Sequence, residues 1–260
     1  MISKCTIIAF TCALLTICES AFVDTLTKCE VDDKACLKEL TQKMFIKIAP
    51  TGVPEYNIPP YDPLELKGIK VPILGLLTIT IEEGTARGIK DCVFNKFNVN
   101  IKKGYLSMAL TCDLDVDVKV KLGDINEVIQ NTLGTKAIEG SGSAKLKLDK
   151  LHIKIKYFYD IVKRDDGKIY IDCKPEEAVY DYEVGDAKIL LEKLFIGGVD
   201  VAKQVNGILQ PNTKVLVSTF GSEFFKVAKN VVADIVHAIF DKTSTDHFIS
   251  TDLSPHVKNA

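Results

Sequence analysis

The C-terminal part of the chain carries one apolar stripe that constrains the fold more than any other feature. Apolar residues recur there at spacings of three and four, the period of an α-helix buried along one face. Charged residues among them, such as Lys214, Glu223 and Asp234, exclude a membrane span. The predicted helix therefore needs a long apolar partner within the protein. The stripe consists of Leu216, Phe220, Phe224, Val227, Val231, Ile235 and Ile239.

That partner is predicted to be a set of long, half-buried strands. From residue 114 to 122, apolar and polar residues alternate strictly, which indicates a strand with one wet face and one apolar face. Residues 97–101 and 106–110 alternate on either side of Lys103-Gly104, which predicts a hairpin. Several such strands facing one long helix predict an α+β fold in which the sheet wraps the helix.

The apolar residues change parity farther along the chain. Leu146 and Leu148 point one way, whereas Leu151 and the apolar residues that follow it have the opposite parity. The apolar side can stay on one face only if an extra residue is inserted. We therefore predict a β-bulge at Asp149-Lys150 that bends the sheet. Asp165-Asp166-Gly167 then marks another hairpin turn.

The first residues predict export. Lys4 precedes an apolar run from Cys5 to Ile17, and small residues follow at the end of the run, as in a signal peptide. The run is shorter than the roughly 20 residues that a bilayer span needs. Residues 1–20 are thus predicted to be a signal peptide of a secreted, extracellular protein. Because no linker or repeat interrupts the remainder, residues 21–260 are predicted to form a single domain.

Export makes disulfides possible. The close pair Cys29 and Cys36 is the natural disulfide in an oxidising compartment. Cys92, Cys112 and Cys173 cannot all pair within the chain, so at least one of them is free, buried or intermolecular. The sequence leaves open which one.

Two further segments precede the strands. Asp32 is predicted to cap a helix that ends at Ala49, because the apolar residues between them recur at helical spacing. Five prolines follow between Pro50 and Pro63, which predicts a stiff, extended segment crossing the molecule.

Composition and motifs exclude several classes of function. A formal net charge of −2 gives no electrostatic reason to expect nucleic acid as a partner. The histidines and cysteines show no metal-ligand spacing, so no metal or cofactor is expected. No nucleophile elbow, phosphate-binding glycine loop or zinc-protease motif occurs, so the chain is not expected to be an enzyme.

Two N-terminal motifs carry a family resemblance. Residues 28–37 read KCEVDDKACL, and residues 52–63 read GVPEYNIPPYDP. This opening closely resembles that of the insect takeout and haemolymph juvenile-hormone-binding family. The resemblance continues through Gly140-Ser141-Gly142 and residues 192–198, and so covers essentially the whole mature chain. It implies that Cys29 and Cys36 form the family's N-terminal disulfide.

The resemblance also implies a fold and a function. The fold is a long C-terminal helix wrapped by a strongly curved antiparallel sheet, a TULIP-like super-roll with an internal hydrophobic tunnel. The function is a secreted carrier, expected to be a monomer, for a juvenile-hormone-like terpenoid, a fatty acid or another lipid. Two alternatives remain: a membrane-surface lipid-binding protein of the permeability-increasing type, and a lipid esterase. The expected tunnel lining is Phe45, Phe97, Val99, Met108, Leu110, Tyr157, Tyr159, Phe220, Phe224, Val227 and Val231.

Overall fold

The computed structural model describes residues 22–73 and 75–258, apart from the side chains of residues 223, 227, 228 and 231. The predicted signal peptide lies outside the described residues. The helices are α1 (Lys34–Ile48), α2 (Glu127–Leu133), α3 (Ala202–Leu209) and α4 (Thr213–Lys242). The strands are β1 (Leu64–Leu66), β2 (Ile69–Ile73), β3 (Leu77–Arg87), β4 (Val93–Asn100), β5 (Tyr105–Gly123), β6 (Gly140–Lys163), β7 (Ile169–Ile196) and β8 (Val199–Asp200).

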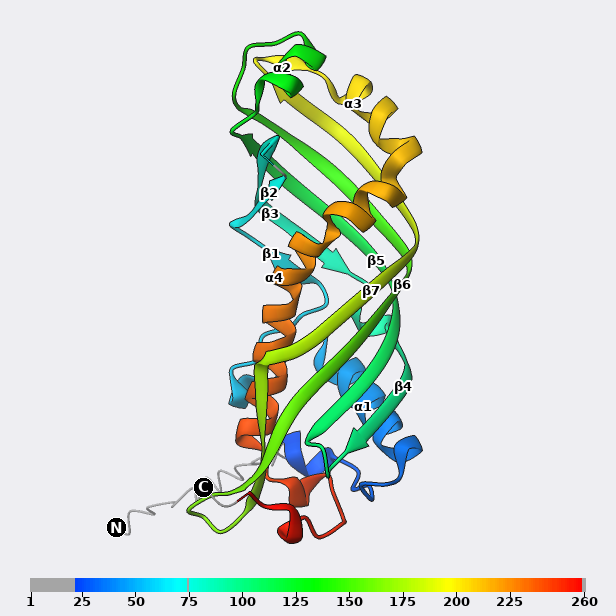
Figure 1. Cartoon of the computed structure of the whole chain (residues 1–260), viewed down its shortest axis with the longest axis vertical. Helices are drawn as coiled ribbons and strands as arrows, with labels where there is room; N and C mark the ends of the chain where they lie inside the picture. The colour runs from blue at the N-terminus through cyan, green and yellow to red at the C-terminus, as the bar shows by residue number, and fades with distance from the viewer. Residues whose placement is uncertain (1–21, 74, 259–260) are drawn as a thin grey trace, which may run out of the picture.

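The strands of the described chain form one antiparallel sheet. Its order is β1-β3-β5-β6-β7-β8, with β2 also paired to β3 and β4 also paired to β5. β4 pairs with residues 105–111 of β5, and β3 pairs with residues 115–123 of the same strand. Figure 1 shows α4 running obliquely along the curled sheet, and α4 contacts both β7 and β2. The sheet therefore wraps the long helix, as the sequence predicted.

The predicted bulge is present and has a clear geometry. Asp113 of β5 stands opposite two residues of β6, Asp149 and Lys150. Lys150 takes a φ of 53°, and its backbone N–H donates to Asp113 Oδ1 at 2.7 Å. The inserted residue reverses the alternation of inward and outward side chains in β6. Apolar side chains therefore face inward both before and after the bulge.

A larger bulge, which the alternation does not predict, bends β7. Four residues of β7, 175–178, lie opposite the single residue Tyr157 of β6. Pro175 among them has no N–H that could donate a hydrogen bond to the neighbouring strand. Figure 1 shows the sharp corner that β7 makes in its lower half. Tyr157 is completely buried opposite this corner.

Two details at the N-terminus correct the sequence predictions. The residue that caps α1 is Asp33, not Asp32, because the Asp33 carboxylate accepts from the N–H groups of Ala35 and Cys36. The proline-rich segment is not extended throughout. It folds into a short 3-10 turn at Pro54–Tyr56, and Asn57 in the left-handed region (φ 58°) lets the chain reverse.

Both disulfides involve residues of the N-terminal half. Cys29 and Cys36 are bonded, as predicted, and Cys92 is bonded to Cys112. Cys173 is the free cysteine of the described chain. Burial raises the pKa of the Cys173 thiol to about 12, so it is protonated and unreactive at neutral pH.

The apolar core is divided along the length of the roll. A large cluster fills the lower half between α1, β4 to β7 and the C-terminal segment. Another cluster fills the upper end beneath α2 and α3, and a small cluster around Leu148 and Leu151 lies between these two. The candidate site lies where the upper and the small cluster meet.

Candidate ligand-binding hollow

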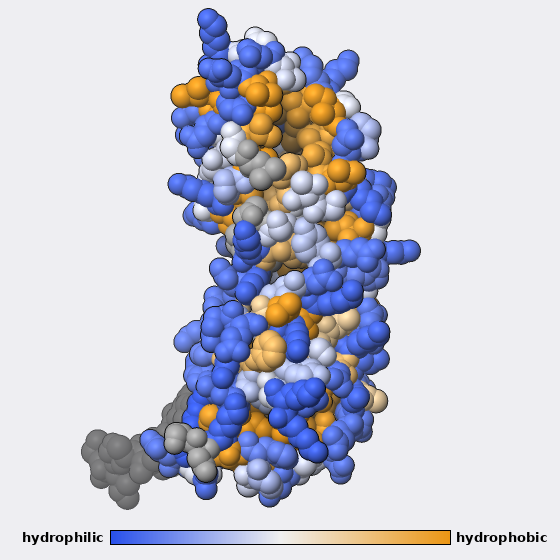
Figure 2. Space-filling view, in the orientation of Figure 1, coloured by the Kyte–Doolittle hydropathy of each residue, from blue (hydrophilic) through white to orange (hydrophobic). Residues whose placement is uncertain are grey.

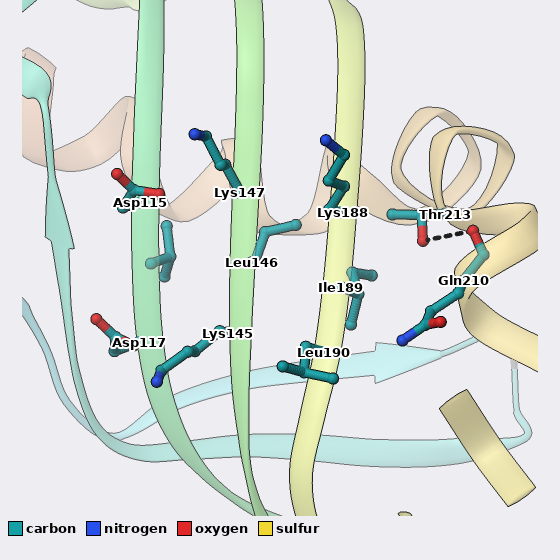
Figure 3. A pocket seen from close by; sticks show the side chains of 11 residues that line it. Asp115, Asp117, Lys145, Leu146, Lys147, Lys188, Ile189, Leu190, Gln210 and Thr213 are labelled. Atoms are coloured by element: carbon teal, nitrogen blue, oxygen red, sulfur yellow. Dashed lines mark hydrogen bonds between the residues drawn. The ribbon is translucent and has the colours of Figure 1, made fainter. Parts of the chain in front are cut away.

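A hollow of about 660 Å³ lies between the sheet and the start of α4. Its walls come from three adjacent strands, β5, β6 and β7, and from the junction between α3 and α4 (Figure 3). The bordering residues are Asp115, Val116, Asp117, Lys145, Leu146, Lys147, Lys188, Ile189, Leu190, Gln210 and Thr213.

The apolar wall of this hollow is a single row across the sheet. Val116 pairs with Leu146, and Leu146 pairs with Ile189, so the three side chains share one face. That face is the inner one, because the next rows on either side belong to the apolar clusters that face the helices. All three are nevertheless only half-buried. The row therefore leaves part of its apolar surface open to the hollow.

The charged residues bordering the hollow belong to the outer face by strand alternation, and the three lysines and Asp117 among them are already paired. Lys145 Nζ lies 2.6 Å from Glu192 Oε1, Lys147 Nζ lies 3.7 Å from Asp149 Oδ1, and Lys188 Nζ lies 3.9 Å from Asp186 Oδ2. Asp117 is paired with Arg87 at 3.0 Å. Such exposed pairs add little stability, but they leave the three lysines with carboxylate partners.

The helix junction supplies the polar groups of the hollow. Thr213 is 2% exposed, and its hydroxyl donates to the backbone carbonyls of Leu209 and Gln210 at 2.9 and 3.3 Å. Gln210 is solvent-exposed and borders the hollow. Figure 3 shows its side chain directed from the junction toward Ile189 and Leu190 of β7.

A second hollow, of about 400 Å³, lies between β7 and α4 farther along the helix, and Tyr182, Lys214 and Ser218 are among the residues that border it. Tyr182 packs against the helix. Its ring stacks on Phe225 with centroids 3.9 Å apart, and its hydroxyl donates to the carbonyl of Val217 at 3.4 Å. A side chain at Gly221 would clash, because a Cβ there would lie 2.8 Å from the Tyr182 hydroxyl.

These contacts correct the predicted face of α4. The sequence stripe placed Phe224 toward the sheet, but Phe224 is 38% exposed, and Phe225 stacks on the sheet instead. A shift of one residue turns a side chain by about 100° around a helix. Gly221, which an apolar stripe overlooks, is buried on the sheet side of α4.

The other predicted lining residues lie mainly in the lower core. Leu110, Tyr157 and Tyr159 are buried there, whereas Phe45, Phe97, Val99 and Met108 are half-buried against the same cluster. Phe220 is half-buried on α4, and the side chains of Val227 and Val231 lie outside the described ones. None of the nine with described side chains borders either hollow, so their contact with a ligand stays a prediction.

Tyr157 and Tyr180 form a hydrogen-bonded pair in this core, and Tyr159 is buried in the same cluster. The Tyr180 hydroxyl donates to the Tyr157 hydroxyl at 2.6 Å, and Lys229 Nζ lies 5.2 Å from the centre of the Tyr180 ring. Burial, with the Tyr180 hydrogen bond, raises the pKa of Tyr157 well above its usual value. Burial also raises the pKa of Tyr159 to about 12. Both phenols are neutral at physiological pH.

Figure 2 shows apolar side chains around a recess at the upper end, where α2 and α3 lie. Across the described helices, none combines the length and hydrophobicity needed to cross a membrane. Nor do three or more His, Cys, Asp or Glu side chains of residues 22–73 and 75–258 gather as metal ligands would.

A long helix wrapped by a curved antiparallel sheet, with a hollow between them, defines the class of TULIP-like folds. The crystal structure of Takeout 1 from Epiphyas postvittana has this fold: it superposes with a TM-score of 0.74, covering 86% of this chain and 99% of that one at 22% identity. A lipopolysaccharide binding protein superposes with a TM-score of only 0.39 at 12% identity, over 79% of this chain and 38% of that one, which is too low to establish a shared fold.

The sequence comparison identifies the family. The model of the haemolymph juvenile hormone binding protein family matches residues 5–250, and the chain belongs to this family. A juvenile hormone-binding protein of Manduca sexta is 27% identical over 171 residues, which are 64% of this chain. The match likewise spans 64% of the length of that relative.

Proposed function

We propose that this protein is a carrier that holds a small hydrophobic molecule in the hollow between β5 to β7 and the α3–α4 junction. The observation that carries the proposal is the half-buried apolar row Val116, Leu146 and Ile189, which lies on the inner face of the sheet and borders the hollow. Family membership and the name of the Manduca sexta relative support a ligand such as a juvenile-hormone-like terpenoid, a fatty acid or another lipid.

The size of the hollow fits such a ligand. Pockets for small molecules usually hold about 300 to 1,000 Å³, and this one holds about 660 Å³. Burying a chain of about 12 methylene groups contributes roughly 10 kcal/mol gross. Association and ordering cost several kcal/mol, which leaves affinities between about micromolar and nanomolar.

Filling the hollow tests the proposal. The hydrocarbon fluorophore 1,6-diphenyl-1,3,5-hexatriene becomes fluorescent in an apolar environment and can be titrated directly. We expect the double variant Leu146→Trp, Ile189→Trp to bind the fluorophore at least about tenfold more weakly. Both indole rings would fill the hollow and so reduce the apolar surface that the fluorophore can bury there. The matched control, Val215→Trp with Val232→Trp, places the same rings on exposed positions of α4. The proposed site would be refuted if wild-type protein did not bind the fluorophore, or if both double variants lost the same amount of affinity for it.

The proposed function also includes the location and the oligomeric state of the protein. We propose that it is secreted as a single-domain monomer and acts by binding, without catalysis. Two disulfides within the chain support an oxidising destination. N-terminal sequencing of protein recovered from the medium of insect cells should begin near residue 21, and retention of the full leader in cells would contradict secretion.

A further inference from the structure

One side chain at the first hollow, that of Gln210, has hydrogen-bonding groups without a partner in the described structure. Within the described structure, the Gln210 carboxamide forms no hydrogen bond with another residue. Thr213, the other polar side chain of the junction, already donates its hydroxyl to backbone carbonyls. A carboxamide both donates and accepts. Gln210 is thus an exposed residue at the border of the hollow with an unpaired donor and acceptor, and its side chain is directed toward Ile189 (Figure 3).

The charges around the hollow disfavour an ionised ligand. Lys145, Lys147 and Lys188 stand on the outer face and each already has a carboxylate partner. A carboxylate that entered the apolar hollow would lose hydration without gaining an unpaired cation, which is costly. An uncharged hydroxyl or carbonyl needs only one hydrogen-bond partner.

We infer that Gln210 is the specificity-determining residue of the carrier and hydrogen-bonds an uncharged oxygen of the ligand. This inference rests on the proposed function. The polar end of the ligand lies at the α3–α4 junction, and its apolar chain lies along the row Val116, Leu146 and Ile189. Gln210 therefore sets both the orientation of the ligand and the preference for an alcohol or carbonyl over a carboxylate.

The test uses three probes of different polarity on the full mature protein at pH 8. Diphenylhexatriene reports binding of a pure hydrocarbon, and 1-dodecanol and dodecanoate compete with it. Wild-type protein should bind dodecanol more tightly than dodecanoate. Gln210→Met, which keeps the length of the side chain, should weaken dodecanol binding about 3- to 10-fold, the effect of one hydrogen bond. Diphenylhexatriene binding should change by less than about twofold.

A matched variant controls for the loss of an amide on the same helical segment. Gln204 is exposed on α3 and borders neither hollow, so Gln204→Met should leave all three affinities unchanged. Equal dodecanol affinity in wild type and Gln210→Met, or tighter binding of dodecanoate than of dodecanol to wild type, would overturn the role of Gln210 while leaving the carrier function intact. Wild-type protein that binds no probe would overturn the carrier function and this inference together.

Discussion

The buried pair Tyr157 and Tyr180 offers a quantitative test of how the corner in β7 is held. Tyr157 has no exposed surface, Tyr180 is half-buried, and their hydroxyls are 2.6 Å apart. Tyr180→Phe would leave the Tyr157 hydroxyl buried without its partner, which costs about 2 kcal/mol. Tyr157→Phe removes the fully buried member, and the Tyr180 hydroxyl can turn toward water, so we expect a loss of about 1 kcal/mol.

The double variant separates the pair interaction from the single losses. Replacing both tyrosines removes donor and acceptor together, which is close to neutral, so we expect a total loss of about 1 kcal/mol rather than the sum of about 3 kcal/mol. The free energy of unfolding would be measured by urea denaturation, followed by far-UV circular dichroism with both disulfides intact. Tyr170→Phe is the control, because its exposed hydrogen bond to Asp166 should contribute less than about 0.5 kcal/mol. Additive losses in the double variant would refute the reasoning.

Two further predictions follow from the buried tyrosines and from the helix cap. Burial raises the pKa values of Tyr61, Tyr157 and Tyr159 above the value of about 10 in an unfolded chain, so the folded state holds these protons more tightly. Stability should therefore be unaffected by these groups below about pH 10 and fall as pH rises through 10 to 12. Absorbance at 295 nm should show them ionising only with unfolding; simultaneous titration of all eight tyrosines in a folded protein would contradict this. Asp33→Ala should cost about 1 kcal/mol in urea unfolding because it removes the cap of α1, whereas Asp32→Ala should change stability by less than about 0.5 kcal/mol. The reverse order would show that Asp32 caps the helix.

Several elements were predictable because their signal is local. The alternation from 114 to 122 recurs in β5, and the parity change at Leu148 and Leu151 marks the bulge that the structure shows. The segment that forms β1 to β3 was not assigned from sequence, because Pro72, Gly75 and a continuous apolar run obscure its alternation. The seven-residue helix α2 is likewise too short for a periodic signal.

The site itself was less predictable than the fold. Val116 and Leu146 were expected on apolar strand faces, but nothing in their pattern separates them from Val118 or Leu148, which do not border the hollow. Whether a row meets the helix or leaves a hollow depends on the distance between sheet and helix. That distance is set by contacts between residues remote in sequence, such as the close approach of Gly221 in α4 to the Tyr182 hydroxyl of β7.

The sequence by itself determined the long helix, the alternating strands, the bend at Asp149-Lys150 and the Cys29–Cys36 pair, since periodicity, parity and close spacing are local properties. Only the tertiary structure decided that Cys92 pairs with Cys112, that Phe225 and not Phe224 meets the sheet, and that Gln210 borders the hollow. The physical reason is that these contacts join elements up to tens of residues apart. Their geometry follows from how far the sheet curls, which no single segment encodes.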